Sequence, residues 1–401
     1  MRGFNKFFVF ERNVTVSGLV SLFMDISSEM IYPLVPLFLA NVLGVNKSVI
    51  GLIEGIAEST ASLLRVFSGW FSDRIGNRKW LMVVGYGIST FSRPLLALAS
   101  GWHHVMGFRF IDRFGKGIRT APRDAIVAES TKKEYLGRAF GFQRAMDTLG
   151  AAIGPAIAFL LMGIFAEGYR VVFWLSIIPG AIAVLLIIFF IREKQRPAVR
   201  RSVLPKLTFG YFDSKIKFFV LIAAIFAAGN SSDVFLILRA QQEGIGAETI
   251  PIVYLMFNII YALTSIPAGI AADRFGRRRI ILLGFVIFAF VYYGFARADG
   301  PKAIWGLFAL YGIFMGLSEG VQKAYLASII PADFKATAFG IYNTAIGLAA
   351  FPASLVGGLL WDRISPSATF YYGCFTAAIS AVLFGAFILH EKINGVKKTE
   401  N

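Results

Sequence analysis

The sequence predicts an all-α membrane protein whose twelve transmembrane helices form two pseudo-symmetric halves of six. Hydrophobic residues make up 56% of its 401 residues and charged residues only 16%, whereas soluble proteins carry about 25% charged residues. This composition argues against a soluble enzyme. The pattern G-x-x-x-D-R-x-G occurs at 69–76 and again at 269–276, so the two copies lie 200 residues apart. The chain therefore repeats one plan twice.

Twelve segments reach the length of about 20 mostly apolar residues that a bilayer requires. The predicted spans are 14–42, 48–71, 80–100, 105–128, 137–165 and 171–191 in the first half, and 216–239, 249–272, 280–298, 303–330, 336–361 and 368–390 in the second. The fourth span carries many charges, but we retain it because the tenth span occupies the same place in the second half. The spans leave no room for a soluble domain.

The basic residues mark the predicted cytoplasmic side. A basic linker at 192–215 joins an N-terminal six-helix bundle (1–191) to a C-terminal one (216–401), and both copies of the repeated motif are also basic. Short basic connections stay in the cytoplasm. We therefore expect both termini to be cytoplasmic, in the inner membrane of a bacterial or archaeal cell. The net charge of +16 then reflects topology rather than nucleic acid binding.

The repeated motif consists of Gly69, Asp73, Arg74 and Gly76 in the first copy and Gly269, Asp273, Arg274 and Gly276 in the second. Its glycines allow a sharp turn and close helix packing, and its Asp can accept hydrogen bonds at a helix start. The motif resembles the signature loop of the major facilitator superfamily, found after the second helix of each half. This resemblance covers the whole chain. It implies a secondary transporter that works by alternating access, with the substrate site between the halves and the loops as conformational latches.

The first predicted helix carries two acids, Asp25 and Glu29, which lie four residues apart on one face. Glu29 with Pro33 and Pro36 resembles the first helix of facilitator drug–proton antiporters, in which an embedded acid precedes a P-x-x-P pair. A carboxyl group buried in a cavity can exchange protons near neutral pH. We therefore predict proton coupling at Glu29 and Asp25. The alternative is a permanent salt bridge between Glu29 and an Arg across the bundle.

The fourth predicted helix carries cations along one face, at Arg109, Arg113, Lys116, Arg119 and Arg123. Arg113 with Gly117 resembles the family's fourth-helix pattern R-x-x-x-G, whose Arg is implicated in proton coupling. Lys116 departs from that pattern, in which a neutral amide is usual, and Arg119 and Arg123 are additions to it. These extra cations favour an anionic group on the substrate, which Arg can bind in a bidentate manner. Alternatively, acids of neighbouring helices neutralise them.

Other polar residues within the spans are predicted to line the substrate cavity. They are Glu54 and Glu58 in the second helix, and Asn230, Asp233, Asn258 and Glu319 in the second half. Charge inside a membrane is costly and usually functional. For the two glutamates, the alternative is pairing with the cations of the fourth helix. Aromatic residues of the second half could line a site for an amphiphile, namely Phe257, Tyr261, Tyr311, Tyr342 and Phe351.

The fifth predicted helix contains Gly150, Gly154 and Pro155, with Ala158 after them. The segment resembles the G-x-x-x-G-P-x-x-G pattern of facilitator antiporters, with Ala in place of the last Gly. Small residues four apart allow close helix packing, and proline can kink the helix. The pattern favours exchange of substrate for another species over uniport.

These observations predict an antiporter that exports an amphiphilic small molecule in exchange for protons. The alternatives are transport of an organic anion, such as a phosphorylated or carboxylated metabolite, and a non-transporting membrane receptor on the same fold. The sequence contains no apparent nucleophile–base set, nucleotide-binding motif or metal-ligand spacing, so we expect neither an enzyme nor a cofactor or metal. The expected partners are the small-molecule substrate, protons and the lipid bilayer, and the protein is expected to be a monomer.

Overall fold

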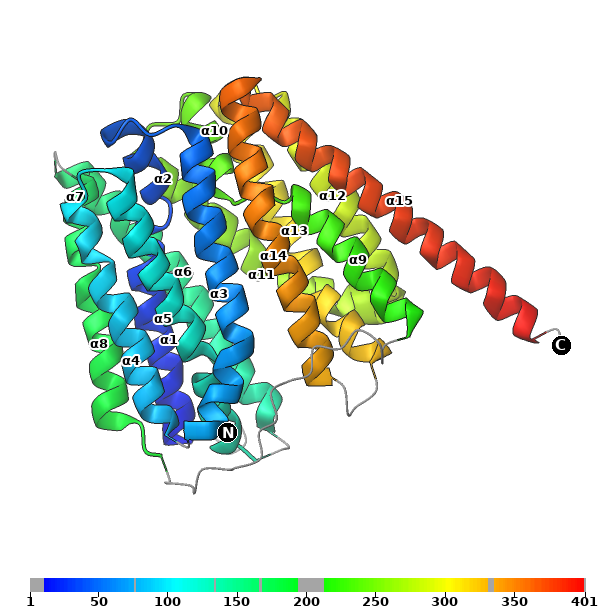
Figure 1. Cartoon of the computed structure of the whole chain (residues 1–401), viewed down its shortest axis with the longest axis horizontal. Coiled ribbons are helices and arrows are strands. Elements are labelled where there is room, and N and C mark those ends of the chain that lie inside the picture. The colour runs from blue at the N-terminus through cyan, green and yellow to red at the C-terminus, as the bar shows by residue number, and fades with distance from the viewer. Residues whose placement is uncertain are drawn as a thin grey trace, which may run out of the picture. The chain divides into compact units, whose positions relative to one another are not determined.

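The computed structural model describes residues 11–75, 77–132, 135–165, 168–193, 213–330 and 335–399. All regular elements in these residues are helices (Figure 1). Ten helical segments are long and apolar enough to cross a membrane. The predicted all-α membrane class is therefore confirmed.

The helices of the first half are α1 (Arg12–Ile31), α2 (Val35–Leu37), α3 (Lys47–Ile75), α4 (Arg78–Ser92), α5 (Trp102–Glu129), α6 (Leu136–Ile164), α7 (Gly168–Leu175) and α8 (Ile177–Phe190). A π-helical turn, Phe38–Val42, continues α2, and a 3-10 turn, Pro94–Leu98, continues α4. Pro33 lies between α1 and α2, and Pro94 begins the 3-10 turn. Because proline has no N–H to donate, each interrupts the helical hydrogen bonds of its span.

The helices of the second half are α9 (Ser214–Gly229), α10 (Val234–Gln242), α11 (Ile250–Phe275), α12 (Arg277–Ala296), α13 (Pro301–Ile329), α14 (Lys335–Arg363) and α15 (Pro366–Thr399). The predicted seventh span consists of α9 and α10, with a non-helical break at 230–233 between them. A break of this kind leaves backbone groups free to bond with side chains.

Length and composition together confirm ten of the twelve predicted spans. The other two correspond to α3 and α5, which have 29 and 28 residues and are therefore long enough to cross. They are not among the apolar spans, and α5 is the helix that the sequence already marks as charged. Both are candidates for helices whose polar faces are turned away from lipid.

The chain divides into two compact units, each described by itself. Unit 1 comprises Met1–Phe38 and Thr60–Leu204, and unit 2 comprises Leu39–Ser59 and Pro205–Asn401. The helix α3 contributes to both, since its residues group with unit 2 up to Ser59 and with unit 1 from Thr60 onward. The predicted boundaries at 191 and 216 stay a prediction, and most of the predicted linker, 194–212, lies outside the described residues.

In unit 1, α1 packs against α6 and α8, and α4 packs against α5 (Figure 1). The contact between α4 and α5 is close because glycines face each other across it. A Cβ added to Gly85 would lie 2.9 Å from the carbonyl oxygen of Gly115. The helices α1, α4 and α8 share an apolar core that includes Val20, Met82 and Ile187. These contacts hold the charged helix α5 at a defined place beside α4.

In unit 2, α11 packs on α13, α12 on α15, and α9 on α14 and α15. Stacked aromatic rings fill its interior, and the rings of Phe288 and Tyr292 lie 4.0 Å apart between centroids. Asp362 near the end of α14 accepts hydrogen bonds from the backbone N–H groups of Lys47 and Ser48, at 3.2 and 2.7 Å. These bonds satisfy two of the free donors at the start of α3.

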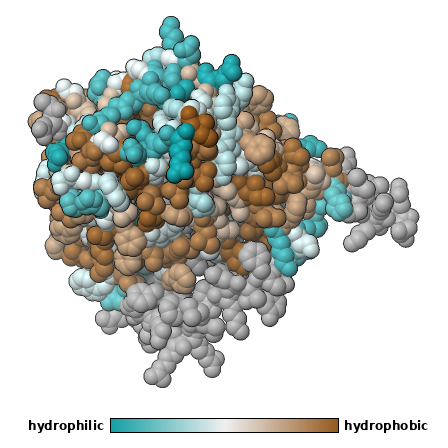
Figure 2. All heavy atoms as spheres, turned by 45° about the horizontal axis from the view of Figure 1, so that its top comes forward, coloured by the Kyte–Doolittle hydropathy of each residue, from teal (hydrophilic) through white to brown (hydrophobic). Residues whose placement is uncertain are grey.

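Large hydrophobic side chains lie on the outer faces of the helices. Hydrophobic residues cover much of the flank seen in Figure 2, and hydrophilic residues gather toward one end. Several of these side chains are 65–74% exposed, namely Leu263, Ile266, Ile270, Phe290 and Val382. In water such a surface would drive aggregation, whereas lipid chains can cover it.

Candidate functional site

The acidic face of α1 lies directly beside the glycines of α6. A Cβ added to Gly150 would lie 2.8 Å from the Cβ of Asp25, and one added to Gly154 would lie 2.9 Å from the Cβ of Glu29. Both acids are partly buried, and Pro155 lies inside α6 next to Gly154. The absence of side chains at the two glycines lets α6 approach α1 closely at the positions of the two acids.

The two acids of α1 share their surroundings with the cations of α5. The charged groups that act on Glu29 are Asp25, Arg93, Arg113 and Lys116. Those that act on Asp25 are Lys116, Arg119, Arg123 and Asp147. The structure therefore brings α1 and α5 together as the sequence suggests, with Lys116 acting on both acids. This charge cluster in unit 1 is the candidate coupling site.

The cations of α5 differ in burial and in partners. Arg109, Arg113 and Arg119 are buried, whereas Lys116 and Arg123 are partly buried. Arg123 pairs with Asp124 of its own helix at 3.0 Å and with Asp147 of α6 at 3.9 Å, and it donates to Ser21 of α1 at 3.2 Å. Acids of its own and of a neighbouring helix therefore lie beside Arg123.

Arg119 has a different environment from Arg123. Its guanidinium lies 4.4 Å from the ring centroid of Tyr86 on α4, which is a cation–π contact. The side chain is only 5% exposed, and its Nη1 makes no hydrogen bond to the part of the chain that the structure describes. A buried donor without a hydrogen bond costs about 1–3 kcal/mol. Such a donor can serve a ligand oxygen.

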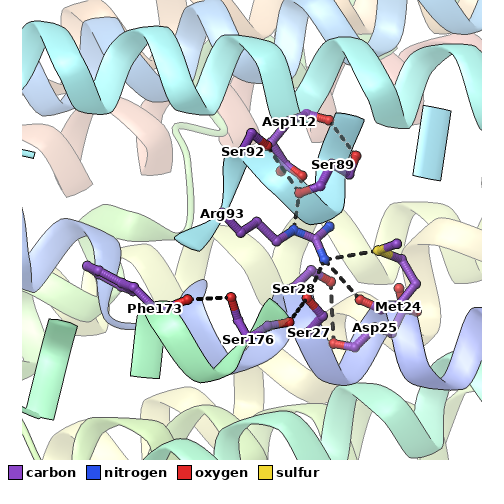
Figure 3. A network of polar contacts seen from close by, with 10 residues as sticks. All are labelled: Met24, Asp25, Ser27, Ser28, Ser89, Ser92, Arg93, Asp112, Phe173 and Ser176. Carbon is purple, nitrogen blue, oxygen red and sulfur yellow. Dashed lines mark hydrogen bonds and ion pairs between the residues drawn. The ribbon is translucent and has the colours of Figure 1, made fainter. Parts of the chain in front are cut away.

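The best-connected residue of unit 1 is Arg93, at the junction between α4 and the 3-10 turn (Figure 3). Its Nε donates to Asp112 Oδ1 at 3.0 Å, and its Nη1 donates to Ser27 Oγ at 2.8 Å and to the Met24 carbonyl at 3.2 Å. The Ser27 hydroxyl in turn donates to the carbonyl of Ser176 at 2.7 Å. One guanidinium therefore joins α1, α4 and α5, and through Ser27 the start of α8.

Sequence reasoning did not identify Arg93. The structure pairs it with Asp112 of α5, at 3.0 Å. A signal was present, because Arg93 is the only charged residue between 81 and 100 in an otherwise uncharged span. A lone charge within a span indicates a buried partner or a functional role.

Two of the polar residues predicted in the second half, Asn230 and Asp233, lie at the break between α9 and α10. The Tyr311 hydroxyl donates to Asp233 Oδ1 at 2.7 Å, and the Tyr292 hydroxyl donates to Asn230 Oδ1 at 3.4 Å. Glu58, which groups with unit 2, acts electrostatically on Asp233. The break thus provides a polar centre within unit 2.

The remaining predicted cavity residues are spread through unit 2. Glu54 and Asn258 are buried, and Glu319 accepts hydrogen bonds from Tyr261 and, at 2.8 Å, from Lys323. Aromatic rings connect this region to the break. Phe257 of α11 stacks on Tyr311 with 5.3 Å between ring centroids and on Tyr261 with 6.4 Å. Tyr342 donates to Gln322, and Phe351 is partly buried.

The second copy of the repeated motif forms the turn from α11 to α12. Gly276 has φ of +95°, a conformation that favours glycine. Asp273, near the end of α11, pairs with Arg277 of the next helix, with Nη2 and Oδ1 3.0 Å apart. Gly269 and Arg274 lie in the last turns of α11. In the first copy, Gly76 and the side chains of Asp73 and Arg74 lie outside the described residues, and Gly69 is helical in backbone.

The family model of the Major Facilitator Superfamily matches residues 18–238 and 218–401. The chain belongs to this superfamily. It is 39% identical over 378 residues to an uncharacterised MFS-type transporter of Methanocaldococcus jannaschii, which covers 93% of this chain and 94% of that protein. The resemblance seen in the motifs is confirmed, and a facilitator of this kind is a transporter rather than an enzyme.

More distant relatives carry more specific descriptions. The chain is 24% identical to a multi-drug resistance efflux pump PmrA homolog of Lactococcus lactis, over 88% of this chain and 89% of that one. It is 27% identical to the cis,cis-muconate transport protein of Acinetobacter baylyi, over 76% and 77%. The solved nucleoside transporter NupG superposes with a TM-score of 0.76 at 14% identity, covering 94% of this facilitator and 98% of NupG. That likeness confirms the facilitator fold.

Proposed function

We propose that this facilitator is an antiporter that exports an amphiphilic small molecule in exchange for protons, by alternating access. The observation that carries the proposal is the position of Asp25 and Glu29 on α1, beside Arg113 and Lys116 of α5. A carboxyl group held among cations and away from water can be ionised in one state and protonated in another. The protein would lie in the cytoplasmic membrane with both termini inside, acting as a monomer.

Coupling requires that the proton and the substrate favour different states of the carrier. In the proposed cycle, Glu29 is ionised while the cations of α5 surround it, and it takes up a proton when rearrangement weakens those interactions. A ligand biases the cycle if it binds one of the two states more tightly. Asp25, which also senses Asp147 and Arg123, would act as the secondary acid.

The aromatic residues of unit 2 support an amphiphilic substrate. Phe257 and Tyr311 are buried and stack on each other, and the partly buried Tyr261 stacks on Phe257. The hydroxyl groups of Tyr261 and Tyr311 bond Glu319 and Asp233, so apolar rings and polar groups lie together in this region, as a site for an amphiphile requires. The description of the Lactococcus relative as a multi-drug efflux pump agrees with this class of substrate.

Transport of an organic anion is the second candidate, and Arg119 is the observation that favours it. Its buried Nη1 has no hydrogen bond within the described chain, so a carboxylate or phosphate could take that place. The Acinetobacter relative is described as transporting cis,cis-muconate, a dicarboxylate. The two candidates differ in the charge of the molecule that moves.

Purified protein in vesicles with an imposed pH gradient tests the proposal. We expect a hydrophobic cation or neutral amphiphile to move against its gradient, whereas movement of dicarboxylates alone would favour the second candidate. Glu29→Gln holds the site in a neutral form, so it should abolish pH-driven accumulation while ligand binding persists without pH dependence. Asp25→Asn should have a smaller effect. Unchanged pH-driven transport by Glu29→Gln would place the coupling site elsewhere, with Glu54 and Asp233 as the next candidates.

A further inference from the structure

The Arg93 network (Met24, Ser27, Arg93, Asp112 and Ser176) includes two residues of α1 that precede Glu29, Met24 by five positions and Ser27 by two. Arg93 is 2% exposed, and its Nη1 is bonded to the backbone of Met24 and the hydroxyl of Ser27. The charge of Arg93 is one of those that act on Glu29. Arg93 therefore both forms hydrogen bonds to α1 and contributes a positive charge that acts on Glu29.

The network holds the guanidinium in one place. Asp112 binds the Nε edge, and α1 binds the Nη1 edge (Figure 3). A guanidinium with donors on both edges occupied has little freedom to rotate. Its positive charge therefore stays at a fixed distance from the α1 acids as long as α1, α4 and α5 keep their packing.

We propose that Arg93 is a positioning residue for proton coupling, which sets the proton affinity of Glu29 by holding a fixed positive charge against α1. The inference rests on the proposed function, in which Glu29 binds the transported proton. The other charges that act on Glu29 are Asp25 on its own helix and Arg113 and Lys116 on α5. The helix α6 faces Glu29 with Gly154, which carries no charge.

In this proposal, helix movement reaches Glu29 through the network. Ser27 donates to the carbonyl of Ser176 between α7 and α8, and the Arg93 side chain leaves α4 where Pro94 breaks the helix. A shift of α4 or α8 relative to α1 would change the distance between Arg93 and Glu29. Proton release would then depend on helix movement, and the proton and the substrate would not need to bind at the same place.

The test measures protonation of Glu29 directly. Protonated carboxyl groups absorb in the infrared apart from carboxylates, and the part of that band that Glu29→Gln removes reports Glu29. Its titration midpoint is then compared in the double variant Arg93→Gln/Asp112→Asn. The double variant replaces a buried ion pair by a neutral pair that can still hydrogen-bond, so neither partner is left as an unpaired charge.

Arg93 is among the charges that act on Glu29 and Asp112 is not, so removing the pair takes away mainly a positive charge at Glu29. We therefore expect the midpoint in Arg93→Gln/Asp112→Asn to rise by about 1 pH unit, because that loss favours the protonated form. Arg170→Gln is the matched control. Arg170 lies in unit 1 and donates to the carbonyls of Ala97 and Ala99, and it is not among the charges that act on Glu29. Its loss should leave the midpoint unchanged. A folded double variant with the wild-type midpoint would overturn the proposal.

A milder pair of variants keeps the test decisive if the double variant does not fold. Ser27→Ala removes the hydroxyl that holds Arg93 on α1, whereas Ser28→Ala removes a neighbouring hydroxyl that donates to the Asp25 carbonyl at 3.3 Å. Ser27→Ala should raise the midpoint and Ser28→Ala should not; equal midpoints would overturn the positioning role. If the wild-type protein showed no pH-driven transport, the proposed function would be refuted, while a shifted Glu29 midpoint in the variants would still establish the effect of Arg93.

Discussion

Arg119 and Arg123 lie one turn apart on α5, yet their guanidinium groups have different surroundings. Arg123 is paired with Asp124 and hydrogen-bonded to Ser21, while Arg119 lies on the ring of Tyr86 with its Nη1 unsatisfied by the described residues. Helical spacing alone assigns both to one face. The two arginines can be told apart only from the tertiary structure, which shows where the acids of the neighbouring helices lie.

We therefore expect opposite results from neutralising these two cations. Arg123→Gln should lower the free energy of unfolding by about 1–3 kcal/mol, because it leaves carboxylates without their partner. Arg119→Gln should keep stability near the wild type and, if the substrate is an anion, weaken its binding tenfold or more. Thermal unfolding and ligand affinity measured on the same preparations distinguish these effects. Loss of stability without loss of anion affinity in Arg119→Gln would argue against an anion site there.

At the scale of helices, α6 packs closely against α1 at the position of Glu29, the proposed proton site. A Cβ on Gly154 would lie 2.9 Å from both the carbonyl oxygen of Ile26 and the Cβ of Glu29. Backbone atoms cannot move aside as a flexible side chain can. Any larger residue at this position must push the two helices apart.

Gly154→Leu should therefore destabilise the protein by about 1–3 kcal/mol and impair proton-coupled transport. Gly141→Ala on the same helix is the matched control. A Cβ there meets no atom within 4 Å among the described residues, and alanine favours the helix by about 1 kcal/mol. Thermal unfolding in detergent, followed by transport in vesicles, measures both effects. Wild-type stability of Gly154→Leu would show that α1 and α6 do not need this close contact.

At the scale of the whole molecule, the repeated motif is the feature that we predict to act in conformational change. In the second copy, the pair between Asp273 and Arg277 is largely exposed, with 71% and 36% of the two side chains accessible. An exposed pair of this kind contributes at most about 1 kcal/mol. The second copy can therefore tolerate loss of its charge.

We predict that Asp73→Asn slows turnover while substrate affinity stays largely intact, and that Asp273→Asn has the smaller effect. The reason is that a latch changes the balance and rate between states without contacting the ligand. Turnover in vesicles and equilibrium binding in detergent separate the two quantities. Equal and unchanged turnover in both variants would be incompatible with a latch in the first copy.

The sequence by itself determined the all-α membrane class, the duplication and the family, because hydropathy and a motif repeated at half the chain length are properties of local sequence. It also placed Asp25 and Glu29 on one face of α1 and the cations on one face of α5, since helical periodicity fixes which residues share a face.

Only the tertiary structure decided which faces meet. It paired Asp112 with Arg93 of α4, and it set Gly150 and Gly154 against the acids of α1. These partners lie 19 and about 125 residues apart along the chain, so no local pattern encodes them. Helix packing determines these partners, because a buried charge is stabilised only by an opposite charge that a neighbouring helix places close to it.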